Sequence, residues 1–340
     1  MQQESTQVPP FRVRVLSAQT NDHANANANA NLGLLLPASF RTDKDDIAPL
    51  KLDNIHYFEK ELGVARLSQL SEWLWVAGRP MPSRPLHYQL LLGREIIIVE
   101  QMDLHLVWTS GRMFLKPIPR YLLEPDFWTI YLACQRDYQC SQAIENPCRH
   151  EKLRKCALGF LFSYAALICY ESDFRLAQER HLLPEQIQWH DWRTLVEELN
   201  TEHIYDKINV RYIYGELRLS RLNKIQYLHS TVGFRGYMSS WNRYGDFFYD
   251  NFTWLASATV YVAIVLTAMQ VGLATESLAE NQAFQSASYG FTVFSIVGPL
   301  AAAGLIVCTF FYVFVSNWVA TVAYRRQRLR HIRTKPEETC

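Results

Sequence analysis

The sequence lacks the short motifs that carry the commonest enzyme chemistries. None of GxSxG, GxxxxGKS/T, HExxH or GxGxxG occurs in its 340 residues. This absence leaves the motif-borne hydrolase, nucleotide-binding and metalloprotease classes without support, and we expect no cofactor. The net charge of +1 gives no sign of nucleic-acid binding either.

Cysteine is infrequent and widely spaced. Four of the seven cysteines, Cys134, Cys140, Cys148 and Cys156, lie near His150, but no CxxC pair occurs. A structural zinc site needs four converging ligands, usually in tight pairs, so we expect no metal. The polar N-terminus also lacks the apolar region of a signal peptide, and we therefore expect reduced thiols in the cytosol.

Charge is absent from two long stretches, 251–275 and 281–324. Within them, Phe252–Thr275 and Phe291–Val315 are mostly apolar. At 1.5 Å per residue each covers roughly 36 Å, more than a bilayer core of about 30 Å. We predict two transmembrane helices over these ranges, with buried helices of a soluble core as the alternative.

Aromatic residues flank the two stretches, as expected at the headgroup level of a membrane. They are Trp241, Tyr244, Phe247, Phe248, Tyr249 and Trp254 before the first stretch, and Trp318 and Tyr324 after the second.

Lysine and arginine predict the orientation of the hairpin. Five arginines and a lysine follow Tyr324, whereas the loop between the stretches holds Glu276 and Glu280 and no Lys or Arg. By the positive-inside bias, both termini of this multi-pass protein are cytosolic, and the organelle is not indicated. The sequon at Asn251 then lies on the cytosolic side, so we expect it to stay unmodified.

Small residues predict how the two helices pack. Ala268 with Gly272, and Gly298 with Ala302, are four residues apart and would allow close approach. Gln270 is a strongly polar side chain in the first stretch. It would form an interhelical hydrogen bond or, alternatively, line a pore.

Composition divides the chain into four parts. Residues 1–50, with an Ala-Asn alternation, read as a disordered tail, and 51–235 as a cytosolic α+β domain. An interfacial aromatic segment with the two transmembrane helices covers 236–324, and a basic cytosolic tail covers 325–340. We thus predict an α+β domain, a small antiparallel meander plus several helices, followed by a C-terminal two-helix transmembrane hairpin.

Within the domain, the predicted meander consists of Ile96–Val99, Leu104–Trp108 and Met113–Leu115. Asn54 caps a first helix, and Pro125 begins another that reaches Cys134. A long helix is predicted over about 152–182. Its uncharged part, 156–170, is short for a membrane span, so we favour a buried core helix over a membrane-dipping segment.

The stretch LWVAGRPMPSRPLHY, residues 74–88, reads as a rigid corner. Its three prolines restrict the backbone, end a helix at Gly78 and lead into a strand near His87. Arg79, Arg84 and Arg94 are then free to share an anion, a phosphate headgroup or a carboxylate.

A second basic segment, Arg211–Leu228, is predicted to be an amphipathic helix. Arg218, Arg221 and Lys224 follow one another at three-residue intervals. Such a surface near a cytosolic leaflet would attract anionic lipid headgroups. A solvated helix face packed on its own domain is the alternative.

Two pairs of residues have side chains suited to acid–base chemistry. His190 with Asp191, and Glu171 with Asp173, have the right chemistry but no third group beside them. Asp191 suits the start of a helix, and Glu171 is spaced to pair with Arg175, so structural roles are favoured.

Several stretches together resemble an uncharacterised fungal family of two-span integral membrane proteins. They are LWVAGRPMPSRPLHYQLLLGREI, MDLHLVWTSGRMFLKPIPRYLLEPDFW, GFLFSYAALICYESDF, YGELRLSRLNKI, ASATVYVAIVLTAMQVGLAT and SASYGFTVFSIVGPL. The resemblance covers nearly everything after about residue 50 and implies membrane integration, but no established activity or cofactor.

The predicted topology also resembles, more weakly, that of CorA-type divalent-cation channels. These channels carry a Gly-Met-Asn motif at the end of their first span. Residues 267–272 read TAMQVG here, so the motif is absent. This departure argues against ion conduction.

Three hypotheses about function follow. The first is a membrane-anchored binding or scaffold protein that acts at the lipid surface without catalysis. The second is an oligomeric ion channel or transporter, and the third a membrane-bound enzyme of specialised metabolism. The expected partners are the lipid bilayer, with anionic lipids, and further copies of the chain. No protein partner is indicated.

Overall fold

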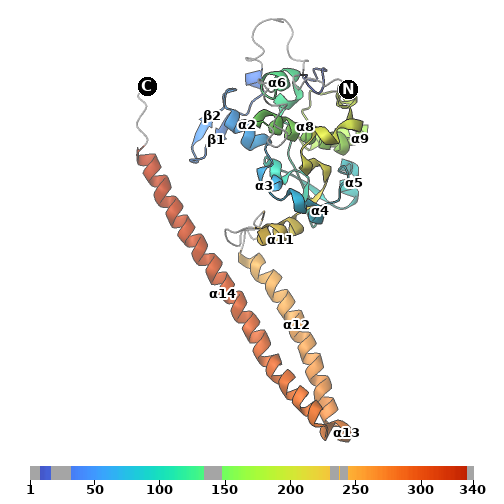
Figure 1. Ribbon diagram of the computed structural model, residues 1–340, viewed down its shortest axis with the longest axis vertical. Coiled ribbons are helices and arrows are strands. Elements are labelled where there is room, and N and C mark those ends of the chain that lie inside the picture. The colour runs from blue at the N-terminus through green and yellow to red at the C-terminus, as the bar shows by residue number, and fades with distance from the viewer. Residues whose placement is uncertain (1–7, 17–31, 134–147, 230–236, 238–243, 335–340) are drawn as a thin grey trace. The chain divides into compact units, whose positions relative to one another are not determined.

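The computed structural model describes residues 8–16, 32–133, 148–229, 237 and 244–334 (Figure 1). The chain divides into two compact units, Met1–Met238 and Ser239–Cys340, which we describe separately.

Helices make up most of the first unit. The α-helices described in it are α2 (Ile55–Leu62), α3 (Ala65–Ser68), α4 (Leu74–Ala77), α5 (Leu86–Leu91), α6 (Pro125–Ile130), α8 (Arg149–Leu167), α9 (Glu171–Glu179), α10 (Trp189–Glu198) and α11 (Leu219–His229). The Asn54 side chain accepts a hydrogen bond from the Tyr57 N–H at 3.0 Å, which confirms the predicted cap of α2. Pro125 begins α6 as predicted, but this helix ends at Ile130.

A four-stranded sheet lies among these helices, in the order β3-β5-β4-β6. Its strands are β3 (Glu95–Ile98), β4 (Val107–Thr109), β5 (Arg112–Leu115) and β6 (Leu217–Arg218). The antiparallel β4–β5 hairpin is confirmed, and its turn uses Gly111 at φ +71°. A second, two-stranded antiparallel sheet joins β1 (Ser39–Arg41) to β2 (Ile47–Pro49), so the α+β class is confirmed.

The predicted all-antiparallel meander is wrong, because β3 pairs with β5 in parallel and β4 with β6 in parallel. The segment between β3 and β4 explains the difference. A 3-10 turn over Met102–Leu104 buries Met102 and Leu104 in the core, and β4 does not return beside β3, so that β5 lies between them.

Two predicted elements differ from the structure near the corner over residues 74–88, which we call the basic corner because of Arg79 and Arg84. The chain enters a helix, α5, rather than a strand near His87, because Leu86 and Gln89, three residues apart, are both buried. The predicted helix over Arg211–Leu228 begins only at Leu219. The residues before it pair with β4 to form β6.

The longest helix of the first unit, α8, is a core element. Its residues from Leu153 to Leu167 are largely buried, which confirms the core-helix prediction for the uncharged segment. The helix ends there, and α9 follows at an angle of 115°. The single helix predicted over 152–182 is therefore wrong. The side chain of Asp173 accepts the Tyr170 N–H at 3.1 Å and so starts a new helix.

The N-terminal residues pack on the first unit where the structure describes them. Phe11, Val15 and Leu32 are buried in the core, and the Phe11 ring lies 6.1 Å from that of Trp128. The prediction of a disordered tail is therefore wrong for residues 8–16 and 32–50. Apolar side chains from both ranges pack against the core of the first unit. The Ala-Asn alternation lies outside the described residues.

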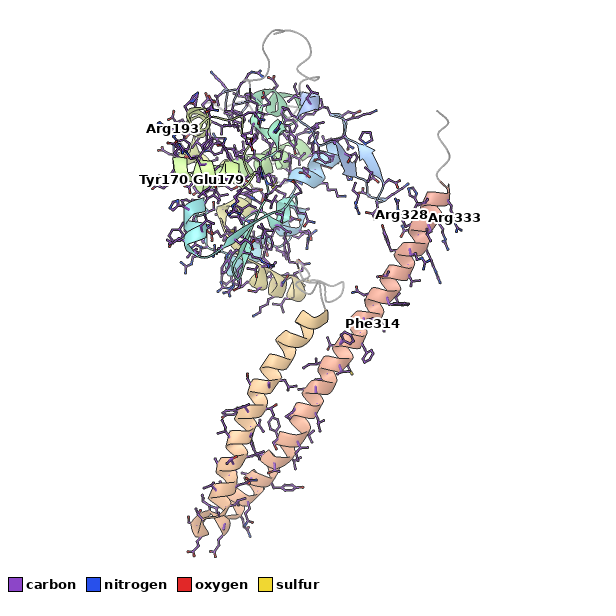
Figure 2. All side chains as sticks on the ribbon, turned by 180° about the vertical axis from the view of Figure 1, so that it is seen from behind. Tyr170, Glu179, Arg193, Phe314, Arg328 and Arg333 are labelled. Atoms are coloured by element: carbon purple, nitrogen blue, oxygen red, sulfur yellow. The ribbon has the colours of Figure 1, made fainter. Side chains whose placement is uncertain are left out.

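The second unit contains α12 (Tyr244–Leu273), α13 (Glu276–Ala279) and α14 (Gln282–Thr334). α12 and α14 lie side by side near α13 and diverge toward their other ends (Figures 1 and 2). Both are long and apolar enough to cross a membrane, by length and composition. α14 continues beyond its apolar part, and Figure 2 shows Arg328 and Arg333 on its last turns.

Candidate functional site

The first unit holds a pocket of about 550 Å³ at the basic corner. Its lining comes from α4, the corner itself, β4, β6 and α11. The lining residues are Trp75, Ala77, Gly78, Arg79, Met81, Pro82, Arg84, Trp108, Glu216, Arg218 and Arg221.

Two glycines allow the corner to lie directly against residues 215–217. Gly215 donates its N–H to the Met81 carbonyl at 2.8 Å. A Cβ at Gly215 would lie 2.5 Å from the Met81 carbonyl oxygen, and a Cβ at Gly78 would lie 2.6 Å from that of Glu216. Because both neighbours are backbone atoms that cannot rotate away, glycine is required at both contacts.

Glu216 is the buried anion that organises the inner wall of the pocket. Its Oε1 accepts from Arg84 Nε and Gln89 Nε2, both at 2.8 Å, and its Oε2 accepts from Arg94 Nη1 at 2.7 Å. Burial alone raises the pKa of Glu216, but the hydrogen bonds from Arg84, Arg94 and Gln89 outweigh it and lower the pKa to about 2. Glu216 is therefore ionised, and both of its oxygens are already occupied.

Three further guanidinium groups line the pocket without a carboxylate. Arg79, Arg218 and Arg221 form no ion pair with any residue that the structure describes. Arg221 donates to the Val76 carbonyl at 3.0 Å, and Arg218 lies 5.1 Å from the Trp108 ring centroid. Four arginines thus face a single glutamate in the lining, and the pocket carries a surplus of positive charge.

This surplus suits an anion with several oxygens. Guanidinium groups present paired N–H donors that match phosphate or carboxylate geometry, and charge-assisted bonds are about twice as strong as neutral ones. The indole of Trp108 also stacks against Arg94, whose guanidinium carbon lies 4.2 Å from the ring centroid. The ring holds Arg94 and Arg218 in place beside the pocket.

The family described as "Family of unknown function (DUF6601)" matches residues 55–299. The chain belongs to this family. The matched range contains every residue that lines the pocket. No curated protein and no solved structure matches the chain significantly. The predicted resemblance to an uncharacterised family is thereby confirmed, whereas a fungal source and two membrane spans stay predictions.

The structure unites two sets of residues that the sequence predicted separately. Arg79 and Arg84 come from the corner and Arg218 and Arg221 from the second basic segment, and all four line one pocket. Arg94 lies behind Glu216, its side chain only 8% exposed, so its partner is that carboxylate rather than a free anion. The last member of the second set, Lys224, is exposed on α11 and does not line the pocket.

Sequence reasoning missed Glu216, Trp75 and Trp108. Trp75 lies within the corner stretch, and Glu216 lies within the second basic segment, two residues before Arg218. Trp108 belongs to a predicted strand, and no feature of the sequence around it indicates a place in a binding site. A lone carboxylate beside two basic segments was the one available hint for Glu216.

The other candidate acid–base residues have structural partners. The fully buried Asp173 accepts the His87 backbone N–H at 2.8 Å and lies 2.9 Å from His87 Nδ1, which links α9 to α5. Glu171 pairs with Arg175 at 2.8 Å, as the spacing predicted. The side chain of Tyr170, at the start of α9, is exposed (Figure 2).

His190 lies 3.0 Å from Asp191 in the first turn of α10. The His190 side chain is exposed, and no described pocket includes either residue. The pair therefore fits the predicted role of Asp191 at a helix start.

A buried Ser–His pair, which the sequence did not indicate, also has a structural role. His105 Nδ1 accepts the Lys116 N–H at 3.1 Å, so its proton lies on Nε2, 2.8 Å from Ser163 Oγ. Ser163 in turn donates to the Phe160 carbonyl at 2.6 Å. Burial lowers the pKa of His105. The neutral imidazole donates to the serine and cannot take its proton, which excludes a nucleophilic pair in this arrangement.

The cysteine cluster supplies no metal site among the described residues. Cys134 and Cys140 lie outside them. The Cys148 thiol caps α8 by accepting the Glu151 N–H at 3.4 Å, and burial raises the pKa of Cys156 to about 11. A high thiol pKa disfavours the thiolate that a metal needs.

In the second unit, the structure places one of the predicted packing glycines at the hairpin contact. A Cβ at Gly272 would lie 2.9 Å from the Phe284 ring of α14. At Gly298 the nearest neighbour is Phe294 of its own helix, and Ala302 is half-buried. Ala268 and Gln270 are exposed, and no interhelical bond of Gln270 forms in the described hairpin.

Proposed function

We propose that this protein is an integral membrane protein whose globular unit binds a phosphate-bearing anion in the arginine pocket. The carrying observation is the surplus of guanidinium groups: Arg79, Arg218 and Arg221 line the pocket without any carboxylate among the described residues. A phosphate oxyanion would accept hydrogen bonds from these three arginines, as Glu216 accepts them from Arg84 and Arg94.

The size of the pocket supports a ligand larger than inorganic phosphate. Its volume of about 550 Å³ lies within the range of sites for small organic molecules. A phosphate ester, free or as a lipid headgroup, has both the charge and the bulk. Trp75 and Met81, at the rim, would contact the part of the ligand next to the phosphate.

The chemistry of the lining supports binding rather than catalysis. Glu216 is the one carboxylate among the lining residues, and its low pKa and full set of donors leave it no proton to exchange near neutral pH. Arginine remains protonated at such pH values, so the other charged lining groups cannot act as bases. We therefore assign the pocket a binding role.

The second unit would anchor the protein in the membrane. α12 and α14 would both cross the bilayer, with both termini in the cytosol, because the arginines of α14 follow its apolar part. The globular unit would then lie on the cytosolic side, where anionic lipids and phosphorylated metabolites are present.

Titration calorimetry tests the binding role. The full chain in nanodiscs of phosphatidylcholine would be titrated with inorganic pyrophosphate and with glycerol 3-phosphate. We expect saturable binding, weakened about tenfold or more by Arg218→Gln, since hydrogen bonds to charged groups contribute roughly 1.5–3 kcal/mol.

Arg193→Gln is the matched control. Arg193 is an exposed arginine on α10 (Figure 2), it pairs with Glu197 at 3.8 Å, and it does not line the pocket. Its replacement should leave binding unchanged. No saturable heat with either probe, or equal losses in both variants, would contradict the proposal.

A further inference from the structure

Exposed apolar side chains lie at the arginine pocket and on the elements next to it. Trp75 is 63% exposed and Leu228 84% exposed, and Trp73 and Met81 are also exposed. Large apolar groups gathered at one place on a surface mark an interaction site more often than single ones do. We call these four residues the apolar rim.

The contacts within the first unit place the rim on one face. Arg221 of α11 donates to the Val76 carbonyl of α4 at 3.0 Å, so these two helices are adjacent. The Trp73 ring lies 5.0 Å from the ring of His229, the neighbour of Leu228 at the end of α11. Trp75 and Met81 themselves line the pocket. The rim therefore extends from Trp73, directly before α4, along α4 and the corner to the end of α11.

Positive charge is interspersed with the rim. Arg79 of the corner, Arg218 of β6 and Arg221 and Lys224 of α11 are exposed, and Glu72 is an exposed acid next to Trp73. Indole rings prefer the headgroup level of a bilayer, and lysine and arginine are attracted to anionic leaflets. Tryptophan beside arginine, around a basic pocket, is complementary to an anionic lipid surface.

The chain itself tethers the first unit closely to the proposed membrane helices. The Tyr237 side chain is buried in the first unit, where its hydroxyl donates to the Asp103 carbonyl at 2.8 Å. Only residues 238–243 separate this anchored tyrosine from α12. Such a short link to an apolar helix would give the first unit, and with it the rim, a high effective concentration at the bilayer.

We infer that the apolar rim docks on an anionic membrane surface, so that the pocket receives the phosphate of a lipid that remains in the bilayer. This inference rests on the proposed function, and it names the source of the anion. Trp73 and Trp75 would lie among the headgroups while Arg79, Arg218 and Arg221 contact the phosphate.

Fluorine NMR of the full chain tests the docking directly. The protein would be labelled with 5-fluorotryptophan and placed in nanodiscs of phosphatidylcholine, alone or with phosphatidylserine. Single replacements by phenylalanine at Trp73, Trp75, Trp108, Trp128 and Trp192 assign the resonances that the test uses. A nitroxide-bearing lipid should then cause loss of the Trp73 and Trp75 signals in the anionic discs.

Internal controls come from the same spectra. Trp128 and Trp192 are buried in the first unit and should keep their signals in every disc. Arg221→Gln with Lys224→Gln should restore much of the Trp75 signal, because the variant reduces the attraction to phosphatidylserine.

The Trp75 and Trp108 signals report separately on membrane docking and on phosphate binding in the pocket. Retention of the Trp75 signal in anionic discs would overturn the docking. A shift of the Trp108 resonance on adding glycerol 3-phosphate would still support the pocket. Loss of the Trp75 signal without any Trp108 response would support the docking and contradict the phosphate pocket.

Discussion

Arg84 and Glu216, 132 positions apart in the sequence, are joined by a hydrogen bond of 2.8 Å from the guanidinium Nε to the carboxylate. This ion pair holds the proline-rich corner against the strand β6. It places two separate basic segments around one pocket, with Arg94 as a second, buried partner of the same carboxylate. The pair explains why the arginines of the corner are not all free to bind a ligand.

Glu216→Gln is expected to destabilise the first unit strongly. The change leaves Arg94 buried without its anion, and breaking a buried pair in this way costs about 3–5 kcal/mol. Thermal unfolding followed by tryptophan emission would measure it in the full chain. Glu197→Gln, which breaks an exposed pair on α10, should cost at most about 1 kcal/mol. Equal effects of the two changes would contradict the role of Glu216.

The same carboxylate should make stability depend on pH. Because the folded pKa of about 2 lies below the ordinary value of 4.5, Glu216 stabilises the fold fully above pH 4.5. This contribution, on the order of 3 kcal/mol, is lost as the pH falls from 4.5 toward 2. The difference in unfolding midpoint between wild type and Glu216→Gln should therefore be constant near neutral pH and shrink in acid. A difference that grows in acid would refute this.

Gly215→Ala should loosen the corner. The new Cβ would lie 2.5 Å from the backbone of Met81 and Ser83, and overpacking of this kind costs about 1–3 kcal/mol. Gly33→Ala is the control, since its nearest neighbour would lie at an ordinary 3.9 Å. Unfolding and pyrophosphate titration of both variants would show whether stability and pocket binding fall together in Gly215→Ala alone. A stable variant with normal binding would show that the corner tolerates a side chain there.

Membrane topology can be mapped by glycosylation. We expect Asn251 to remain unmodified and a sequon inserted with a flexible spacer into the connection between α12 and α14 to be modified. Endoglycosidase treatment followed by gel electrophoresis reads out both sites in the full chain. Modification at Asn251 instead would reverse the proposed orientation and remove the globular unit from the cytosol.

Part of the fold could be predicted from the sequence because the signals are local. The charge-free stretches, the cap at Asn54, the turn at Gly111 and the uncharged core of α8 all depend on neighbouring residues. The parallel pairing of β3 with β5 does not, because it depends on how the intervening 3-10 turn packs.

The candidate site, too, could be predicted only where its signals are local. The basic residues were recognisable as two segments with surplus charge. Their convergence depends on contacts between residues far apart in the chain, such as Gly78 beside Leu217. The distinction between Arg94, which is committed to Glu216, and Arg79, which has no ion pair among the described residues, needs burial and distances that no local pattern contains.

Arginine modification tests the central claim most directly, in the unaltered protein. The full chain in phosphatidylcholine nanodiscs would be treated with phenylglyoxal, with and without inorganic pyrophosphate, and each modified arginine identified by mass spectrometry. The phosphate pocket predicts that pyrophosphate protects Arg79 and Arg218 and leaves the exposed Arg193 unprotected. Equal modification of all three arginines with and without pyrophosphate would contradict the claim.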